Sequence, residues 1–585
     1  MKKTSSNETL VDAVQAMQDE SNLNARIVQA GADLNYWGKK LASSKLVVCE
    51  TLHETFKTYA LSVEAIQNIL NEATPPKKPK ADKVAKEKPE DTRPVSAGAI
   101  THAEETRMGI TAKRFLVTSA QNNTVVHVPF LRNLEAYAEY MDAKLIVFPF
   151  IYNKNAFQNG EGSDDIWYAP EITKYLQNES VWLENVAGSH KVAAMAFNIL
   201  PTVKNPLGGM KEAIGSAEAL IVPHATLAHE CVAVLGAQYG RVVPGMYSTG
   251  TVTQRNYIQQ QAGHKAENRH NFAALIVEFN DHGQFWIRQI ETDETGNFSD
   301  LKTYMSDGQN YADVLTVDVI NYGDIHAEKL DYSVANIQWG IGNLGGESML
   351  DYFRPSFQMA HDLLDFQALN HHNRENHYHM AENQLTGRTV KNDLGDVGDV
   401  LESMSRPWCH TVVVRSNHDD ALDRWLADNK YEPRKDPANA KLYFQLQVEA
   451  YTHLENNTHF DSLPISLNLT ECMPGIAPEF LRASQSYKVG PIELGEHGHS
   501  GTNGSRGSPK QFASMKCTTG HTHTPSIYGG CYTAGVSGKL AMGYNETGAS
   551  SWQHACVLQY KTGFRTIVHV KPYVPGVNNG LAYMA

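Results

Sequence analysis

Aspartate, asparagine and histidine recur in five short motifs in the second half of this 585-residue sequence, and three of the motifs contain glycine. In chain order the motifs are Gly323-Asp324-Ile325-His326, His361-Asp362-Leu363-Leu364-Asp365, Ser416-Asn417-His418-Asp419, Gly495-Glu496-His497-Gly498-His499 and Gly520-His521-Thr522-His523. Carboxylate, amide and imidazole groups are donors that hold manganese, iron or zinc. Neighbouring glycines let the backbone approach an ion closely. The residue types therefore predict a metal site that is assembled from distant parts of the chain.

Each motif follows a stretch that is typical of a short β-strand. The predicted strands cover residues 317–322, 356–360, 411–414, 488–494 and about 515–518, and a helix is predicted at 421–428. Strand ends in an open α/β sheet meet at one crevice, so residues far apart in sequence can share a site there. A lone motif of this kind is weak, because most such histidines are structural. Five motifs in order, each after a strand, favour one site.

The order GDxH, xDxxD, xNHD, HG and GHxH resembles the calcineurin-like metallophosphoesterase family over roughly residues 315–530. The resemblance implies an α/β fold whose C-terminal part is a double-sheet sandwich with two divalent metal ions at the strand tips. It assigns one ion to Asp324, His326 and His523, the other to Asn417, His497 and His521, and a bridge to Asp362. It makes His418 the non-ligand histidine beside the scissile phosphate and Asp419 the residue that orients it.

Two features depart from the family pattern. His361 stands where the second motif normally has glycine, which puts the loop geometry there in doubt. The fourth motif offers two histidines: His497, followed by Gly498, fits better, and His499 is the alternative ligand.

Such a centre suits phosphoester hydrolysis. Two cations bridged by a carboxylate acidify a shared water and neutralise charge on the entering and leaving oxygens. A histidine beside them can protonate the leaving oxygen, which is the task that the resemblance gives to His418. The neutral Asn417 supplies an oxygen ligand without adding charge.

The remaining chain divides into three further segments. Residues 1–73 are predicted to form a helical arm or bundle, and residues 74–97 a lysine- and proline-rich linker. Residues 98–304 are predicted to be a mixed α/β domain, with strands at 114–119 and 144–149 around a helix at 130–141, then apolar runs at 219–223 and 273–279 and an alternating strand at 284–290. The metallophosphoesterase domain would then cover 305–585.

The composition indicates which class of protein and which compartment to expect. The formal net charge of −13 argues against a generally basic surface, although a local basic groove could still bind nucleic acid. Seven scattered cysteines without a CxxC pair suit a reducing compartment. Neither an apolar leader nor a membrane-length apolar run is present, so we expect a soluble intracellular protein that does not enter a membrane.

Loop residues next to the motifs suggest which phosphoester is cleaved. Arg374 and Arg506 are candidate ligands for substrate phosphate, because guanidinium binds phosphate in a bidentate manner. The whole arrangement, including RFLVTSAQNN and HGHSGTNGSRGS, also resembles the first-step-transfer DNases with which tailed phages degrade host DNA. That resemblance implies DNA as substrate, manganese as the favoured metal (with zinc, iron or magnesium as alternatives), a homo-oligomer and the host cytoplasm.

Two other functions stay open on the sequence alone. The same ligands would serve a phosphatase or nucleotidase that acts on small or protein-bound phosphoesters. A non-catalytic DNA-binding scaffold could also keep metals for structure, although such a scaffold would not need His418.

Overall fold

The computed structural model describes residues 108–152, 166–342, 347–370, 376–500, 514–543 and 545–571. The predicted arm and linker lie outside these residues, and so do Arg374 and Arg506. The described chain is a mixed α/β protein with several sheets, which confirms the predicted α/β class. No helix in the described ranges is long and apolar enough to cross a membrane.

The first half is built around a four-stranded sheet. Its order is β11 (Phe285–Thr292), β10 (Phe272–Phe279), β2 (Arg114–Gln121) and β3 (Ala143–Phe150). The strand–helix–strand unit predicted near residues 114–149 is confirmed, because β2 and β3 are parallel and the helix between them, α6 (Val128–Tyr140), packs its apolar side on the sheet. The alternating segment after β10 is its antiparallel partner, as predicted.

An eleven-stranded sheet runs through both halves of the chain. Its order is β1 (Met108–Thr111), β4 (Val181–Glu184), β5 (Val192–Ala194), β6 (Ala219–Val222), β9 (Gly245–Gly250), β7 (His224–Cys231), β22 (Ser526–Tyr528), β23 (Cys531–Thr533), β21 (Cys517–Thr519), β20 (Ile492–Glu493) and β19 (Lys488–Val489). The junction lies between β7 and β22, where His229 faces Ile527 in an antiparallel pair. Segments 98–304 and 305–585 thus share one sheet, and 95–585 forms a single compact unit.

A six-stranded sheet carries the first three motifs. Its order is β18 (Glu479–Phe480), β17 (His410–Val414), β16 (Phe357–His361), β15 (Val317–Asn321), β25 (Ala555–Tyr560) and β26 (Arg565–His569). Strands β15, β16 and β17 are parallel, so their carboxyl ends meet at one edge. One face of this sheet packs on the β19–β23 end of the eleven-stranded sheet, through apolar residues such as Val319, Met359 and Ile492.

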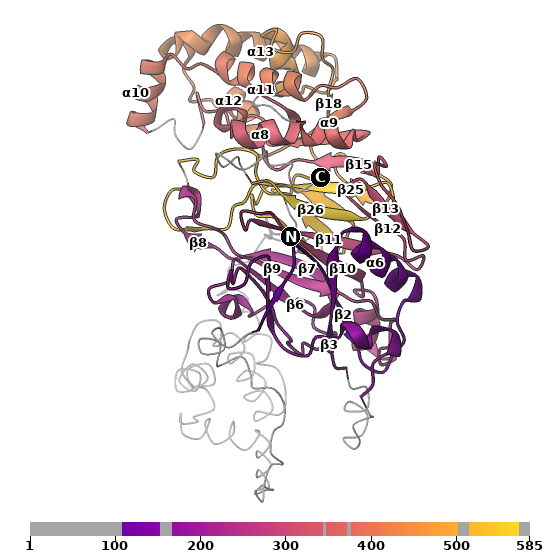
Figure 1. Cartoon of the computed structure of the whole chain (residues 1–585). Helices are drawn as coiled ribbons and strands as arrows, with labels where there is room; N and C mark the ends of the chain where they lie inside the picture. The colour runs from indigo at the N-terminus through magenta and orange to yellow at the C-terminus, as the bar shows by residue number, and fades with distance from the viewer. Residues whose placement is uncertain are drawn as a thin grey trace, which may run out of the picture. The chain divides into compact units, whose positions relative to one another are not determined.

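Helices cover the opposite face of the six-stranded sheet, and in Figure 1 they gather above β15 and β25. They are α8 (Tyr332–Trp339), α9 (Met349–Phe353), α10 (His377–Thr386), α11 (Val390–Met404), α12 (Asp420–Leu426), α13 (Pro437–Glu455) and α14 (Ser462–Leu469). Alternation along the strands produces the two layers: Val412 and Val414 face the neighbouring sheet, whereas Val413 between them faces the helices. The smaller elements are α7 (Gln261–Glu267), a sheet of β12 (Phe298–Asp300), β13 (Thr303–Ser306) and β14 (Gln309–Tyr311), and the pair β8 (Val234–Leu235) and β24 (Ala549–Ser550).

The predicted single strand at 488–494 is wrong. The segment is a tight hairpin of β19 and β20, which pair antiparallel. Gly490 has a φ of 58°, and Pro491 follows it, so the backbone turns at this point instead of continuing as a strand. The turn places the fourth motif directly after β20.

Three buried histidines of the first half should make the free energy of unfolding depend on pH. Burial lowers the pKa of His224 and His229 to about 4, and that of His270 to about 3. The unfolded chain, with histidine pKa values near ~6.5, then binds more protons than the folded chain between about pH 6.5 and 4. The free energy of unfolding should therefore decrease as the pH is lowered through this window, by up to about 1.4 kcal/mol per pH unit for each histidine.

Urea unfolding of protein kept in EDTA, followed at several pH values, measures this dependence. His229→Phe keeps an aromatic ring against Tyr247, on which His229 stacks with ring centroids 4.2 Å apart, and should reduce the slope. The exposed His282→Gln is the matched control and should leave the slope as it is. An unchanged slope in His229→Phe would contradict the prediction.

Candidate metal centre

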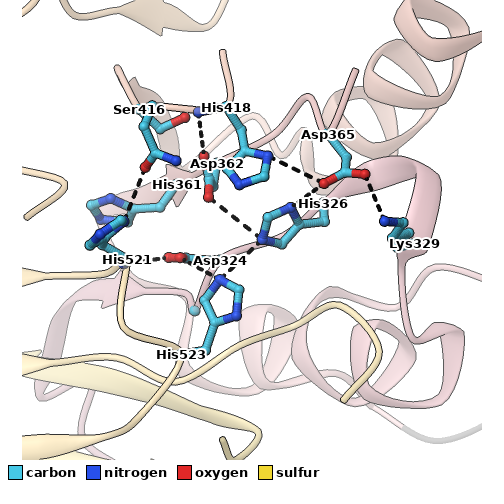
Figure 2. A network of polar contacts seen from close by, with 12 residues as sticks. Asp324, His326, Lys329, His361, Asp362, Asp365, Ser416, His418, His521 and His523 are labelled. Carbon is cyan, nitrogen blue, oxygen red and sulfur yellow. Dashed lines mark hydrogen bonds and ion pairs between the residues drawn. The ribbon is translucent and has the colours of Figure 1, made fainter. Parts of the chain in front are cut away.

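All five motifs meet at one edge of the two packed sheets. The first three follow β15, β16 and β17, and the last two follow β20 and β21 of the facing sheet. Figure 2 shows side chains of the first, second, third and fifth motifs pointing toward one another. The strand ends that carry the motifs therefore lie together, as predicted.

Four buried side chains form the first donor group: Asp324, His326, Asp362 and His523. Each offers one ligand atom, and these atoms all lie within 4.8 Å of one another. His523 Nε2 lies 2.9 Å from Asp324 Oδ2, and His326 Nε2 lies 3.5 Å from Asp362 Oδ2. This cluster can hold a metal ion.

A second donor group lies beside the first. Asn417 Oδ1 is 3.2 Å from His497 Nε2 and 3.0 Å from His521 Nδ1. Asp362 is close to both groups, because its Oδ2 also lies 3.8 Å from His497 Nε2. The structure thus brings the seven predicted ligands close together, grouped as the family resemblance implies.

His497, rather than His499, faces the other donors. Its nitrogens approach Asn417, Asp362 and Asp324, the last at 4.0 Å. The ring of His499 lies behind, with its centroid 5.4 Å from that of His497. His361, the residue in place of the usual glycine, ends β16 and puts its Nδ1 3.4 Å from His497 Nδ1.

The backbone around these ligands is held in a conformation that side chains rarely adopt. His326, Asp362, His521 and His523 have φ values of 47°, 53°, 71° and 54°. Such left-handed residues cost free energy and are concentrated at functional sites. Gly520 meets a different requirement, since a Cβ there would lie only 2.3 Å from Asp324 Oδ1. The loops are therefore shaped to place donors.

The charges of the cluster fit a cation. Burial alone would raise the pKa of Asp362, but nearby histidines, led by His418 and His497, lower it to about 2. Burial lowers the pKa of His497 to about 3, so its ring is neutral at pH 7. Ionised carboxylates and neutral imidazoles are the forms that bind metal.

One contact fits an ion better than a hydrogen bond. The Nε2 atoms of His326 and His523 lie 3.1 Å apart in a buried cluster, and each also faces a carboxylate. Only one of the two nitrogens could donate to the other. A cation would instead accept a lone pair from both, and a donor set of Asp, Asn and His suits manganese, iron or zinc.

The sequence is 46% identical over 552 residues to protein A1 of Escherichia phage T5, and the alignment covers 93% of this chain and 97% of that protein. The chain belongs to the A1 family. No known family profile matches the sequence, and no solved structure matches it.

In this A1-family chain, His418 lies beside the donor groups, and one of its ring nitrogens contacts a carboxylate. Its Nδ1 is 3.3 Å from Asp365 Oδ1, and its backbone N–H donates to Asp362 Oδ1 at 3.2 Å. Burial by itself lowers the pKa of His418, but Asp362 and Asp365 raise it to about 10. The two carboxylates therefore favour the protonated ring, which is the form that can donate a proton.

The carboxylate that contacts the His418 ring is Asp365, and not Asp419 as predicted. The side chain of Asp419 accepts hydrogen bonds from the backbone N–H of Leu364 at 3.1 Å and from Ser416 Oγ at 2.7 Å, so it points into the protein. Burial raises the pKa of Asp419 to about 7, which weakens its charge. Asp365 also reaches His326 Nδ1 at 3.2 Å and Lys329 Nζ at 3.0 Å.

Three residues at the site were given no role by sequence reasoning: His361, Asp365 and Arg424. The spacing of the second motif, with Asp365 three residues after Asp362, was a usable signal. Arg424 gave none, since it is an exposed residue of α12 whose Nη2 donates to the Asn417 carbonyl at 2.7 Å. It adds a cation at the rim of the cluster.

Proposed function

We propose that this A1-family chain is a metallophosphoesterase-type DNase, which hydrolyses phosphodiester bonds of DNA with two divalent metal ions. The observation that carries the proposal is the position of Asp362. It lies between the two donor groups and also next to His418, whose protonated form Asp362 and Asp365 favour. A purely structural metal site would not need a protonated histidine at its edge.

The residues divide the chemistry between them. One ion would be held by Asp324, His326 and His523, the other by Asn417, His497 and His521, with Asp362 shared. Two such cations acidify a bound water and neutralise charge on the entering and leaving oxygens. Manganese is the favoured ion, and zinc, iron or magnesium are alternatives.

His418 serves as the general acid in this proposal. Water loses one proton to the solvent as its oxygen joins the phosphorus, the bond from phosphorus to the leaving ester oxygen breaks, and His418 gives its proton to that oxygen. Asp365 keeps the ring in place through Nδ1, so the opposite nitrogen, Nε2, is the one that would face the substrate.

DNA as substrate is supported by the phage relative, because a phage that replicates in a bacterium meets host DNA in the host cytoplasm. The donor groups alone serve a phosphatase or nucleotidase equally well, so the choice of substrate depends on what surrounds them. A homo-oligomer stays a prediction.

The deciding experiment incubates purified protein with plasmid, linear DNA, RNA and p-nitrophenyl phosphate, each with manganese, magnesium, zinc or EDTA. We expect manganese-dependent cleavage of both DNA forms and none in EDTA. Cleavage of DNA should fall steeply between about 50 and 200 mM salt, because bound phosphates release counterions. Preferential hydrolysis of p-nitrophenyl phosphate without a salt dependence would identify a small-molecule phosphatase instead.

A further inference from the structure

A large cavity of about 620 Å³ lies where the two halves of the chain meet. Segments before β9 and at the start of β11 line one side, and loops 539–541 and 552–554 line the other. A volume in the range of about 300–1,000 Å³ is usual for cavities that bind small ligands. The cavity contains none of the proposed metal ligands.

The cavity nevertheless shares a wall with the metal centre. Trp552 lines the cavity, and its ring packs against the ring of His523 with centroids 4.1 Å apart and planes at 68°. The next residue, Gln553, also lines the cavity, and its backbone N–H donates to the carbonyl of His523 at 3.1 Å. A molecule in the cavity would therefore sit one side chain away from the metal ligands.

Cations exceed acids in the lining. The two acids already have partners: Glu218 pairs with Lys191 at 3.6 Å, and Asp331 caps α8 by accepting from the backbone N–H of Ser333 at 3.0 Å. Arg241 and Lys539 are exposed, and no carboxylate of the described chain pairs with either. Their charges are available to an anion.

Lys571 adds a third cation deeper in the cavity. Its Nζ donates to the Phe285 carbonyl at 2.5 Å and lies 4.5 Å from the centre of the Phe285 ring. Burial lowers the pKa of Lys571 to about 8, so the amine still carries its charge at pH 7. The cavity therefore combines three cations with a partly exposed tryptophan.

An aromatic ring beside a line of cations is the combination that binds single-stranded nucleic acid, because a base stacks on the ring and the phosphates meet the cations. We infer that this cavity holds an unpaired nucleotide of the DNA strand, next to the phosphate at the metal centre, with its base on Trp552 and its phosphates toward Arg241 and Lys539. The inference rests on the proposed DNase function, and it makes the enzyme one that needs a frayed or single-stranded site.

The test measures binding without catalysis. A labelled six-residue oligo(dT) is titrated with full-length protein in EDTA, and fluorescence anisotropy is followed at several salt concentrations. Arg241→Ala with Lys539→Ala should weaken binding at least tenfold and reduce the magnitude of the log–log salt slope by about 1.4, which is two phosphate contacts at about 0.7 each. Trp552→Leu should weaken binding and leave the salt slope unchanged.

The matched control is Arg132→Ala with Lys441→Ala, an exposed arginine on α6 and an exposed lysine on α13. It should bind as the wild type does. Circular dichroism melting checks that each variant is folded. The inference would be overturned if both double variants lost oligo(dT) affinity equally, or if the cavity variant lost none. It would also be overturned if dTMP competed as strongly as the oligonucleotide, since the occupant would then be a free nucleotide.

The two proposals fail in different ways. If the variant Arg241→Ala with Lys539→Ala binds oligo(dT) normally and the wild type cleaves DNA with manganese, the cavity proposal is refuted and the DNase proposal stands. If that variant binds oligo(dT) more weakly but the wild type cleaves no DNA with any metal, the cavity proposal stands and the DNase proposal is refuted.

Discussion

Asp362→Asn should reduce DNA cleavage by about 10³-fold, which corresponds to about 4 kcal/mol of transition-state stabilisation. Asp362 is buried, and its Oδ2 approaches both donor groups, at 3.5 Å from His326 and 3.8 Å from His497. Asparagine has nearly the same shape but lacks the charge, so the fold should persist while one or both ions bind weakly. The loss should be similar on DNA and on a small chromogenic diester, because the chemical step itself is affected.

Cleavage rates and elemental analysis of the purified variant measure this effect. Asp318→Asn is a suitable control, since Asp318 lies at the start of the neighbouring strand β15, where it accepts a hydrogen bond from Ser356 Oγ at 2.7 Å. The control should retain full activity and two ions. If Asp362→Asn kept more than about a tenth of the wild-type rate, Asp362 would not be the shared ligand.

His418→Ala should keep both metal ions and lose about 10²–10⁴ in turnover. The reason is that Asp362 and Asp365 favour the protonated ring of His418, and the leaving oxygen needs that proton. Substrate binding should change much less than turnover, because the proton is transferred only in the transition state. A leaving group of low pKa, such as p-nitrophenolate, should recover part of the lost rate.

Elemental analysis distinguishes this role from its rival. His418, Asp365 and His326 also form a group whose ligand atoms lie within 4.8 Å of one another, so His418 could itself bind a metal. A missing metal equivalent in His418→Ala would assign it as a ligand. The control is His410→Ala at the exposed start of β17, where the histidine pairs with Glu479 at 2.8 Å.

The candidate site was predictable because its signal is local. Each ligand follows a short strand, and parallel strands such as β15, β16 and β17 bring their ends together whatever lies between them. The α/β class and the unit formed by β2, α6 and β3 were predictable for the same reason. Helix α11 was missed, although Thr389 and Asn392 form a capping box at its start that sequence reasoning could have used.

Other features depend on tertiary contacts that no local pattern encodes. Asp365 and Asp419 occupy similar places in their motifs, and only the turn of each loop decides that Asp365 reaches His418 while Asp419 turns toward Leu364. The hairpin of β19 and β20 depends on a backbone turn at Gly490 inside the segment 488–494. The pairing of β7 with β22 joins residues far apart in sequence, so no local sequence pattern near either strand predicts that the two strands pair.

That pairing also affects how the chain can be made. β7 ends at Cys231, and its partner β22 begins at Ser526. At about 5–20 residues per second, a ribosome needs roughly 15–60 s to synthesise the roughly 300 residues between them. During that time the nascent chain presents one side of β7 without its native neighbour, and an open strand edge is a site of aggregation. Translation speed and chaperone supply should therefore limit the yield of folded protein, and fragments that stop before residue 526 should aggregate.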